Sequence, residues 1–346
     1  MHAVSSAIDM EAGSCGNPAV EAVKTKAYQE LQDMAQRLNM PLTSHPFTEI
    51  LSSLARLLDQ AEYLLNKGII DPQAAVRSAP HDPPPPITGR TLRMGIYPVA
   101  ANPFHWAHLL IGLSALVRFR LDKIIYVISG SDPRKPALAP AEIRHLMGEE
   151  VIKIFEPFFE YSAIALENDC DGEINLFKIL SLNLNRALDL FYIVGADHYH
   201  RVNPRTGEAD TLQKLENKIA ADNHFFNPAL HSISAIFIGR GTRDYTVETD
   251  IPVAFIPGMP FAASSTMIRE AFQGNRPVQT LALIPCTAFN YADAFGLYGS
   301  EFKLNLQNHT ASQRSKRLRL GAAHCAAEVF MAAQILNNAR ATRVVA

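Results

Sequence analysis

The sequence predicts a doubly wound α/β fold, in which helices cover both faces of a parallel sheet. Three observations lead to this prediction. From residue 92 onward, apolar runs of strand length alternate with stretches of helical periodicity. Two of the runs, residues 124–128 and 190–194, are continuously apolar, as are strands that helices cover on both sides. The most distinctive polar residues follow predicted strands, at the edge of such a sheet where ligands bind.

The chain before the sheet is predicted to be mainly helical. Residues 1–21 are small and polar, and we expect them to be disordered. Residues 22–78 form a predicted helical extension, because apolar residues recur at helical spacing in two separate runs. Pro41 and Pro46 separate these runs and therefore predict a helical hairpin. Residues 79–91 are rich in proline and predict a stiff, extended linker.

Residues 92–300 form the predicted α/β domain. Strands are expected at residues 92–98, 123–129, 161–166, 190–195, 232–239 and 252–256. Helices are expected between them at residues 105–120, 140–155, 174–187 and 211–221. Residues 301–346 are expected to form a C-terminal helical segment, whose basic run at 312–320 fits either a solvated helix face or an anion-binding patch. Both terminal extensions are expected to pack on the domain or to join copies of the chain in a homo-oligomer.

The composition favours a cytoplasmic globular protein. The chain has 346 residues, of which 48% are hydrophobic and 19% charged, so it has enough apolar residues for a substantial core. A formal net charge of -2 argues against nucleic acid or an anionic membrane as the main partner. Four scattered cysteines without a CxxC pair suit a reducing compartment and provide no metal framework.

Two short segments carry most of the functional information. The first, Asn102-Pro-Phe-His-Trp-Ala-His108, follows a predicted strand and opens a helix. The second, Ala263-Ser-Ser-Thr-Met-Ile-Arg269, also opens a helix. Backbone N–H groups and the helix dipole favour anions at such positions, and an arginine adds a two-pronged donor. The segments therefore fit the binding of a polyphosphate.

Each segment also has a purely structural interpretation. One of His105 and His108 could cap the helix while the other packs in the core. Ser264, Ser265 and Thr266 form a natural N-cap cluster. Arg269 is harder to explain in this way, because a cation in the first turn of a helix opposes the dipole unless an anion binds there.

The two segments resemble the HxGH and ISSTxIR motifs of the nucleotidyltransferase superfamily. The resemblance is closest to the nicotinate- and nicotinamide-mononucleotide adenylyltransferases and extends over residues 92–300. Further matching segments are Lys135-Pro136, Gly195-Ala-Asp197, Ile284-Pro285, Tyr291 and Leu297-Tyr298. The resemblance implies a Rossmann-like nucleotidyltransferase that transfers AMP from Mg-ATP to a phosphate-bearing acceptor. Nicotinate or nicotinamide mononucleotide is the expected acceptor, and pyrophosphate is the expected leaving group.

The resemblance also implies roles for individual residues. His105, His108 and Arg269 would be catalytic, through their contacts with the phosphates. Lys135 and Tyr199 would contact the acceptor, although Lys135 also fits a solvated loop lysine. Residues expected to line the nucleotide site are Tyr97, Pro98, Val99, Asn102, Gly195, Asp197, Gly239, Arg240, Ser264, Ser265 and Thr266.

Metal binding rests on one candidate side chain. Asp197 would contact a ribose, help to hold Mg²⁺ that enters with ATP, or cap the following turn. His198 and His200 lie close to it in sequence, but two histidines at this spacing without a further ligand do not make a zinc site. Apart from Asp197, no side chain is therefore expected to bind a metal ion.

The chain departs from the resemblance at several positions. Ala107 replaces the glycine between the two histidines, and residues 98–101 lack the usual glycines. The segment 171–178 differs from the Thr-Tyr-Thr-like run typical of the pyridine-nucleotide branch, and Trp106 is the only tryptophan, so the usual stacking tryptophan is missing. These departures keep three alternatives open: a transferase that uses CTP or another acceptor such as phosphopantetheine, a nucleotide-binding regulator without turnover, and an interaction module.

Overall fold

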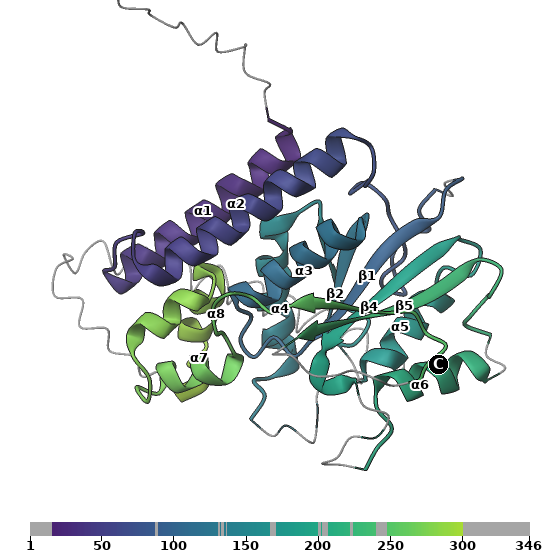
Figure 1. The fold of residues 1–346 in the computed structure, drawn as a ribbon. Coiled ribbons are helices and arrows are strands. Elements are labelled where there is room, and N and C mark those ends of the chain that lie inside the picture. The colour runs from purple at the N-terminus through teal and green to yellow at the C-terminus, as the bar shows by residue number, and fades with distance from the viewer. Residues whose placement is uncertain are drawn as a thin grey trace, which may run out of the picture.

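A six-stranded parallel sheet forms the centre of the molecule (Figure 1). The structure, a computed structural model, describes residues 16–86, 89–130, 132, 135, 137–166, 171–199, 202, 207–221, 224–239 and 248–299. The strand order is β3-β2-β1-β4-β5-β6. Strands β2 and β3 are therefore added on one side of β1, and β4, β5 and β6 on its other side. The strands are β1 (Leu92–Val99), β2 (Lys123–Ile128), β3 (Phe159–Ser162), β4 (Leu188–Gly195), β5 (His231–Gly239) and β6 (Val253–Pro257). This order confirms the predicted doubly wound fold.

Only the third strand differs clearly from its predicted position. It was expected at residues 161–166 but lies at Phe159–Ser162, and residues 164–166 form a turn. Phe159 and Tyr161 pair with Ile124 and Tyr126 of β2. Phe159 and Tyr161 therefore lie in the strand, because cross-strand packing such as that of Phe159 on Tyr126 outweighs the apolar character of the residues that follow.

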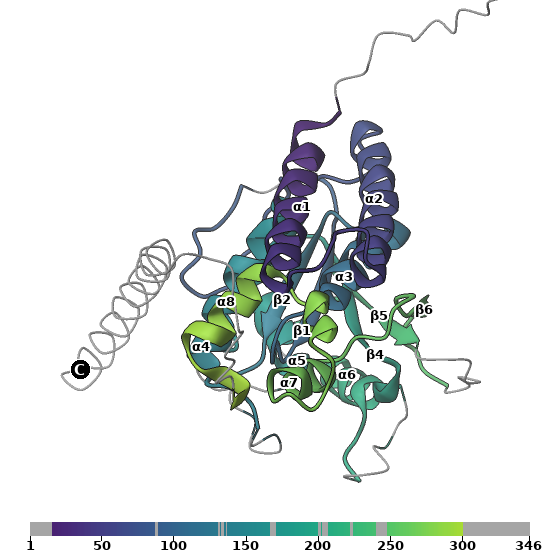
Figure 2. The same cartoon turned by 90° about the vertical axis from the view of Figure 1, so that its left-hand side faces the viewer.

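Alternate strand residues supply two separate apolar clusters, one on each face of the sheet. Leu92, Met94 and Ile96 of β1 belong to one cluster, whereas Tyr97 and Val99 belong to the other. Helices α3 (Trp106–Phe119), α4 (Ala141–Ile152), α7 (Ser265–Phe272) and α8 (Cys286–Ala294) lie on the face of Tyr97. Helices α5 (Gly172–Ser181) and α6 (Thr211–Ala220) cover the opposite face, as the two views show (Figures 1 and 2).

The helical hairpin predicted from the N-terminal sequence is present. Its helices, α1 (Pro18–Leu38) and α2 (His45–Asn66), lie side by side over α3 and α8 (Figure 2). α1 begins at Pro18, earlier than the predicted residue 22, because the Asn17 side chain caps its backbone and proline suits the first helical position. The helical region ends at Asn66, so the residues up to 78 that were also predicted to be helical are not.

An α1 carboxylate ties the hairpin to the domain. Glu30 accepts hydrogen bonds from the backbone N–H of Thr287 at 2.7 Å and from its hydroxyl at 2.6 Å. Thr287 lies in the first turn of α8, where backbone N–H groups lack helical partners. Burial raises the pKa of Glu30 from its ordinary value. The hairpin therefore caps a helix of the α/β domain.

The proline-rich segment runs along the domain in contact with it. Arg186 donates hydrogen bonds to the carbonyl oxygens of Ala75, Pro85 and Pro86. The Asn183 side chain accepts from the backbone N–H of Arg77 at 3.0 Å and donates to its carbonyl at 2.8 Å. These bonds fix the segment at the edge of the sheet where β4 begins, so residues 75–86 are bound along the sheet domain.

Some sequence-based predictions lie outside the described residues. Residues 1–15, expected to be disordered, and residues 301–346, expected to be helical, are among them. None of the helices in the described ranges combines the length and the apolar character needed to cross a lipid bilayer.

Candidate active site

The loop between β1 and α3 is held by its own polar side chain. Asn102 is 2% exposed, and its side chain accepts a hydrogen bond from the Ala139 backbone N–H at 3.0 Å. It also donates to the carbonyl oxygen of Ala137 at 3.2 Å. These two bonds join the β1–α3 loop to the loop that precedes α4. The Asn102 side chain therefore fixes the position of the loop, and its backbone carbonyl oxygen can accept a hydrogen bond from another residue.

His105 and His108 lie together at the start of α3. His105 is the N-cap residue, with extended backbone angles, and its ring stacks on that of His108 with centroids 3.6 Å apart. The backbone N–H of His105 donates a long hydrogen bond, 3.4 Å, to Nδ1 of His108. A neutral His108 that accepts at Nδ1 carries its proton on Nε2, so Nε2 is the donor nitrogen of its ring.

Aromatic residues of the sheet and of the β1–α3 loop contact the histidine pair. Tyr97 and Phe104 make edge-to-face contacts with the His108 ring, with centroids 6.5 and 5.3 Å away. The Tyr126 hydroxyl of β2 donates to the His108 carbonyl oxygen at 3.0 Å. Gly112 makes this bond sterically feasible, because a side chain at that position would collide with the Tyr126 hydroxyl. The first turn of α3 is thus fixed by contacts on the sheet.

The second motif lies beside the first, as the sequence could suggest only by analogy. Ser264 is the N-cap of α7, and its hydroxyl accepts from the Met267 backbone N–H at 3.2 Å. Ser265 donates to the carbonyl oxygen of Pro103 at 3.0 Å. Arg269 donates from Nη1 to the carbonyl oxygen of Asn102 at 2.8 Å. The two segments, separated by about 160 positions in the sequence, are therefore bonded directly to each other.

Arg269 keeps part of its guanidinium available. Nη2 bonds to the exposed Thr266 hydroxyl at 3.2 Å, and the side chain is half-buried. A guanidinium has five N–H donors in a planar fork, so this geometry leaves donors for an anion at the α7 N-terminus.

Other predicted residues occupy the same edge of the sheet. Gly195 and Gly239 are the last residues of β4 and β5. Asp197 lies in the short helix η2 (Ala196–His198) that follows β4, and its side chain is outside the description, as is all of Arg240. Lys135 follows β2 and is solvent-exposed, with its amine 3.7 Å from a carboxylate oxygen of Asp132. A phosphate near Lys135 would have to compete with that weak ion pair.

Three predicted site residues of β1 point to the two faces of the sheet. Tyr97 and Val99 are buried in the core under α3, so their side chains support the site rather than line it. Pro98 is half-buried on the other face, where a side chain at Gly172 would approach its ring carbons. Any contact of Tyr97 or Val99 with a nucleotide would have to involve the backbone.

Tyr199 is placed differently from its prediction as an acceptor contact. The residue is 4% exposed, and its ring packs edge to face on Phe237 and Phe255, with centroids 5.0 and 5.3 Å away. These rings belong to the cluster on the α5 and α6 face, opposite the histidine pair. Tyr199 was expected at the acceptor as a substitute for the missing stacking tryptophan, whereas in this structure its ring packs in the core behind η2.

Arg144 was not among the predicted site residues. This residue is fully buried in α4, and its guanidinium donates to backbone carbonyl oxygens at the ends of β1 and β2. A sequence signal was available: Arg144 lies three, four and seven positions before Met147, Gly148 and Val151, which form the buried stripe of the helix. An arginine on such a stripe requires several polar partners.

Comparison with known proteins identifies relatives of one kind. A probable nicotinate-nucleotide adenylyltransferase of Thermoanaerobacter sp. is 28% identical over 216 residues, which cover 60% of this chain and 95% of the relative. The nicotinate-nucleotide adenylyltransferase of Bacillus subtilis is 29% identical over 213 residues, which cover 60% of this chain and 99% of the relative. Over about 60% of its length the chain is similar to nicotinate-nucleotide adenylyltransferases. These relatives are nucleotidyltransferases, in agreement with the motif resemblance. No family model matches the sequence.

Among solved structures, similar chains include a Plasmodium falciparum nicotinic acid mononucleotide adenylyltransferase. Its complex with NaAD has a TM-score of 0.45 at 15% identity and covers 61% of this chain and all of that one. Its complex with APC has a TM-score of 0.43 at 15% identity, with the same coverage.

Proposed function

We propose that the protein transfers AMP from Mg-ATP to a phosphate-bearing acceptor, nicotinate or nicotinamide mononucleotide, to give a dinucleotide and pyrophosphate. One observation carries the proposal: the N-termini of α3 and α7 are bonded together at the carboxyl edge of the sheet, through Arg269 to Asn102 and Ser265 to Pro103. Two helix N-termini, two histidines and an arginine gathered there suit a polyphosphate. Homology to nicotinate-nucleotide adenylyltransferases supports the choice of acceptor.

The proposed reaction is an in-line displacement at phosphorus. An acceptor phosphate oxygen forms a bond to the α-phosphorus of ATP while the bond from that phosphorus to the bridging oxygen breaks. The electron pair of the broken bond leaves with pyrophosphate. No covalent intermediate with the protein is needed, so catalysis depends on positioning and on stabilisation of developing negative charge.

The proposal assigns this stabilisation to named donors. His108 would donate from Nε2 to a phosphate oxygen, and the stacking of His105 would hold its ring in place. Arg269 would bind the β- or γ-phosphate with the donors that Asn102 and Thr266 do not use. Ala107, 4% exposed, occupies the position of the usual glycine between the two stacked histidines.

Magnesium would enter with the nucleotide. The described residues contain no group of three or more His, Cys, Asp or Glu side chains that could hold a metal ion. Mg²⁺ in phosphoryl-transfer sites often has phosphate oxygens, water and only one or two carboxylates as ligands, so the residues present suit an ion carried mainly by ATP. The ion would neutralise phosphate charge, and Asp197 is the candidate carboxylate next to it.

Pyrophosphate release tests the proposal directly. Mg-ATP and Mg-CTP are each supplied with nicotinate mononucleotide, nicotinamide mononucleotide or phosphopantetheine. We expect release with ATP and one pyridine mononucleotide. Release only with CTP or phosphopantetheine would assign a different substrate pair, and ATP binding without release in any combination would favour the regulator.

A pair of histidine variants serves as a control for this assay. His108→Ala removes the proposed donor, whereas His45→Ala removes an 81% exposed histidine at the start of α2. Loss of release in the first variant alone would attribute the activity to this site and exclude a contaminating enzyme.

A further inference from the structure

The guanidinium of Arg144 has a shell composed of backbone oxygen atoms. Nη1 donates to the carbonyl oxygens of Ala100 at 2.6 Å and Ser129 at 2.8 Å, and lies 3.4 Å from the Ser129 hydroxyl. Nη2 donates to the Gly130 carbonyl at 2.7 Å, and Nε donates to the Ala139 carbonyl at 2.9 Å. All three nitrogens are therefore engaged by neutral acceptors.

The charge of Arg144 is thus buried without a carboxylate in contact with it. In the described part of the chain no ion pair joins this arginine to an acidic side chain, although Asp132 and Glu142 lie near enough to favour its charged form. Burial lowers the pKa of Arg144 from its ordinary value, but a guanidinium starts so high that it stays protonated at neutral pH. Burial of a cation is costly, and here hydrogen bonds to carbonyl oxygens rather than a contacting carboxylate offset the cost.

The carbonyl oxygens that Arg144 binds belong to the loops of the candidate site. Ala100 lies two residues before Asn102, whose carbonyl oxygen accepts from Arg269. Ala139 is held twice, since its N–H donates to the Asn102 side chain and its carbonyl accepts from Arg144. Arg144 thereby connects the end of β1, the end of β2 and the loop before α4 in one network.

The loop in this network has a strained backbone. Ala101 has a φ of 50°, in the left-handed region that glycine adopts without penalty and alanine does not. Such a conformation costs about 1–2 kcal/mol and persists only where neighbouring contacts enforce it. The bonds to Ala100 on one side and Asn102 on the other provide this enforcement.

We propose that Arg144 is a positioning residue of the phosphate site, which holds the β1–α3 loop in its strained form and supplies an uncompensated positive charge beneath the polyphosphate. The inference rests on the proposed function, since it assumes that a nucleotide polyphosphate occupies this edge of the sheet. Arg269 would contact the phosphates directly. Arg144 would act indirectly, by holding the loop and through the electrostatic field of its positive charge.

The number of phosphates on the ligand provides the test. Dissociation constants are measured for adenosine, AMP, ADP and ATP with the wild-type protein and with Arg144→Gln. Loss of a positive charge should weaken binding in proportion to ligand charge, so we expect about a tenfold or larger loss for ATP and a change within about twofold for adenosine. An equal loss for all four ligands, or none for ATP, would overturn the inference.

Arg186 provides a matched control. It is also buried, 7% exposed, and also donates only to backbone carbonyl oxygens among the bonds described for it, but it lies before β4, at the opposite edge of the sheet. Arg186→Gln should destabilise the protein without changing the ratio of ATP to adenosine affinity. If both variants change this ratio equally, the effect is one of stability and the assignment to Arg144 is wrong.

A second variant separates the two parts of the proposal and is needed if Arg144→Gln does not fold. Lysine keeps the charge of Arg144 but not its planar fork, so it cannot reach all four carbonyl oxygens. Arg144→Lys should bind ATP within about threefold of wild type, whereas kcat should fall about tenfold or more because the loop is released. Wild-type kcat and ATP affinity in this variant would refute the positioning role. Failure of the wild-type protein itself to bind ATP would instead refute the proposed function.

Discussion

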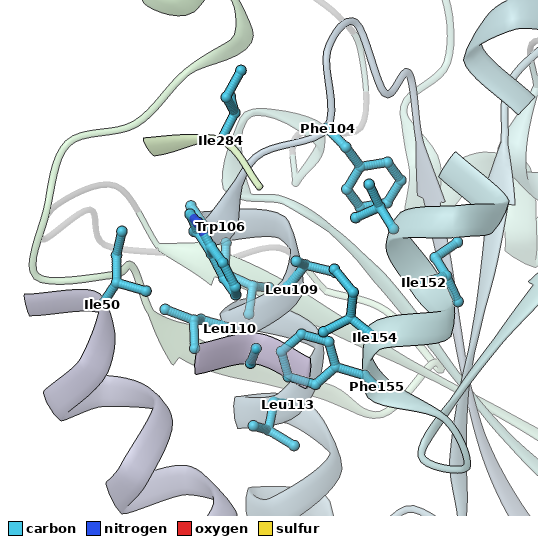
Figure 3. Packing of buried hydrophobic residues seen from close by; sticks show 14 of the residues in the cluster. Ile50, Phe104, Trp106, Leu109, Leu110, Leu113, Ile152, Ile154, Phe155 and Ile284 are labelled. Carbon is cyan, nitrogen blue, oxygen red and sulfur yellow. The ribbon is translucent and has the colours of Figure 1, made fainter. Parts of the chain in front are cut away.

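Trp106 is expected to determine how firmly the N-terminal hairpin holds the histidine motif. It is the first residue of α3, lies between His105 and His108 in the sequence, and is completely buried. Its ring packs near Ile50 of α2 and Ile284, on the side of α3 turned toward the hairpin (Figure 3). Replacement of this residue therefore tests a contact between the added helices and the candidate site.

Two substitutions at this position should have very different effects. Trp106→Ala removes an entire buried ring system, and substitutions of this kind cost about 3–5 kcal/mol of unfolding free energy. Trp106→Phe keeps most of the apolar contact. It also removes an indole N–H that is buried without a hydrogen-bond partner among the described residues, a group whose desolvation costs about 1–3 kcal/mol. The two contributions offset each other, so we expect Trp106→Phe to lie within about 1 kcal/mol of wild type.

Urea unfolding followed by far-ultraviolet circular dichroism measures these differences. Fluorescence is unsuitable for the variants because Trp106 is the only tryptophan of the chain. Tyr63→Ala, at a position 60% exposed on α2, is the control and should change stability by less than about 0.5 kcal/mol. A loss below about 1 kcal/mol for Trp106→Ala, or equal losses for both Trp106 variants, would refute the reasoning.

Three further predictions concern catalysis, pH and the hairpin. His108→Ala should lower turnover by about 10²–10³-fold, the usual effect of removing one transition-state donor, while the thermal midpoint stays nearly unchanged; the reverse pattern would make His108 structural. Burial lowers the pKa of His145 to about 4, below the value near 6.5 expected in the unfolded chain, so the unfolded state binds more protons as the pH falls from 6.5. Urea titrations should therefore show about 2 kcal/mol less stability at pH 5 than at pH 7, and His145→Gln should remove most of this slope. Glu30→Ala should cost about 1–3 kcal/mol because Thr287 loses its acceptor, whereas Glu30→Gln should cost less, since its amide oxygen can accept the same bond without burial of a charge; equal losses would contradict this explanation.

Most of the fold could be predicted because it depends on local patterns. The continuous apolar runs at 124–128 and 190–194 lie in β2 and β4, and the expected order of strands and helices is present. The third strand and the end of the N-terminal helices were displaced, since aromatic pairing on β2 and the bound segment before β1 are long-range effects. The division of the chain into domains at residues 79–91 remains a prediction, although that segment contacts Arg186.

The candidate site was predictable in its residue types but not in its contacts. A strand followed by a helix places His105 and Arg269 at one sheet edge, and this can be inferred from the sequence. That Arg269 bonds to the carbonyl oxygen of Asn102 cannot be, because any exposed carbonyl is an equally good acceptor until the fold selects one. The orientation of Tyr199 was likewise not predictable, since a tyrosine suits an acceptor contact and a core position equally well, and only the fold packs its ring on Phe237.

The parallel sheet, its carboxyl edge and the two motifs could be inferred from the amino-acid sequence, because apolar periodicity and the residues that begin a helix are local properties of the chain. The packing of Trp106 near the hairpin, the capping of α8 by Glu30 and the burial of Arg144 against the β1–α3 loop are known only from the folded chain. These contacts join residues that are distant in sequence. Whether a buried charge or hydrogen bond is favourable depends on which neighbours the complete fold brings to it.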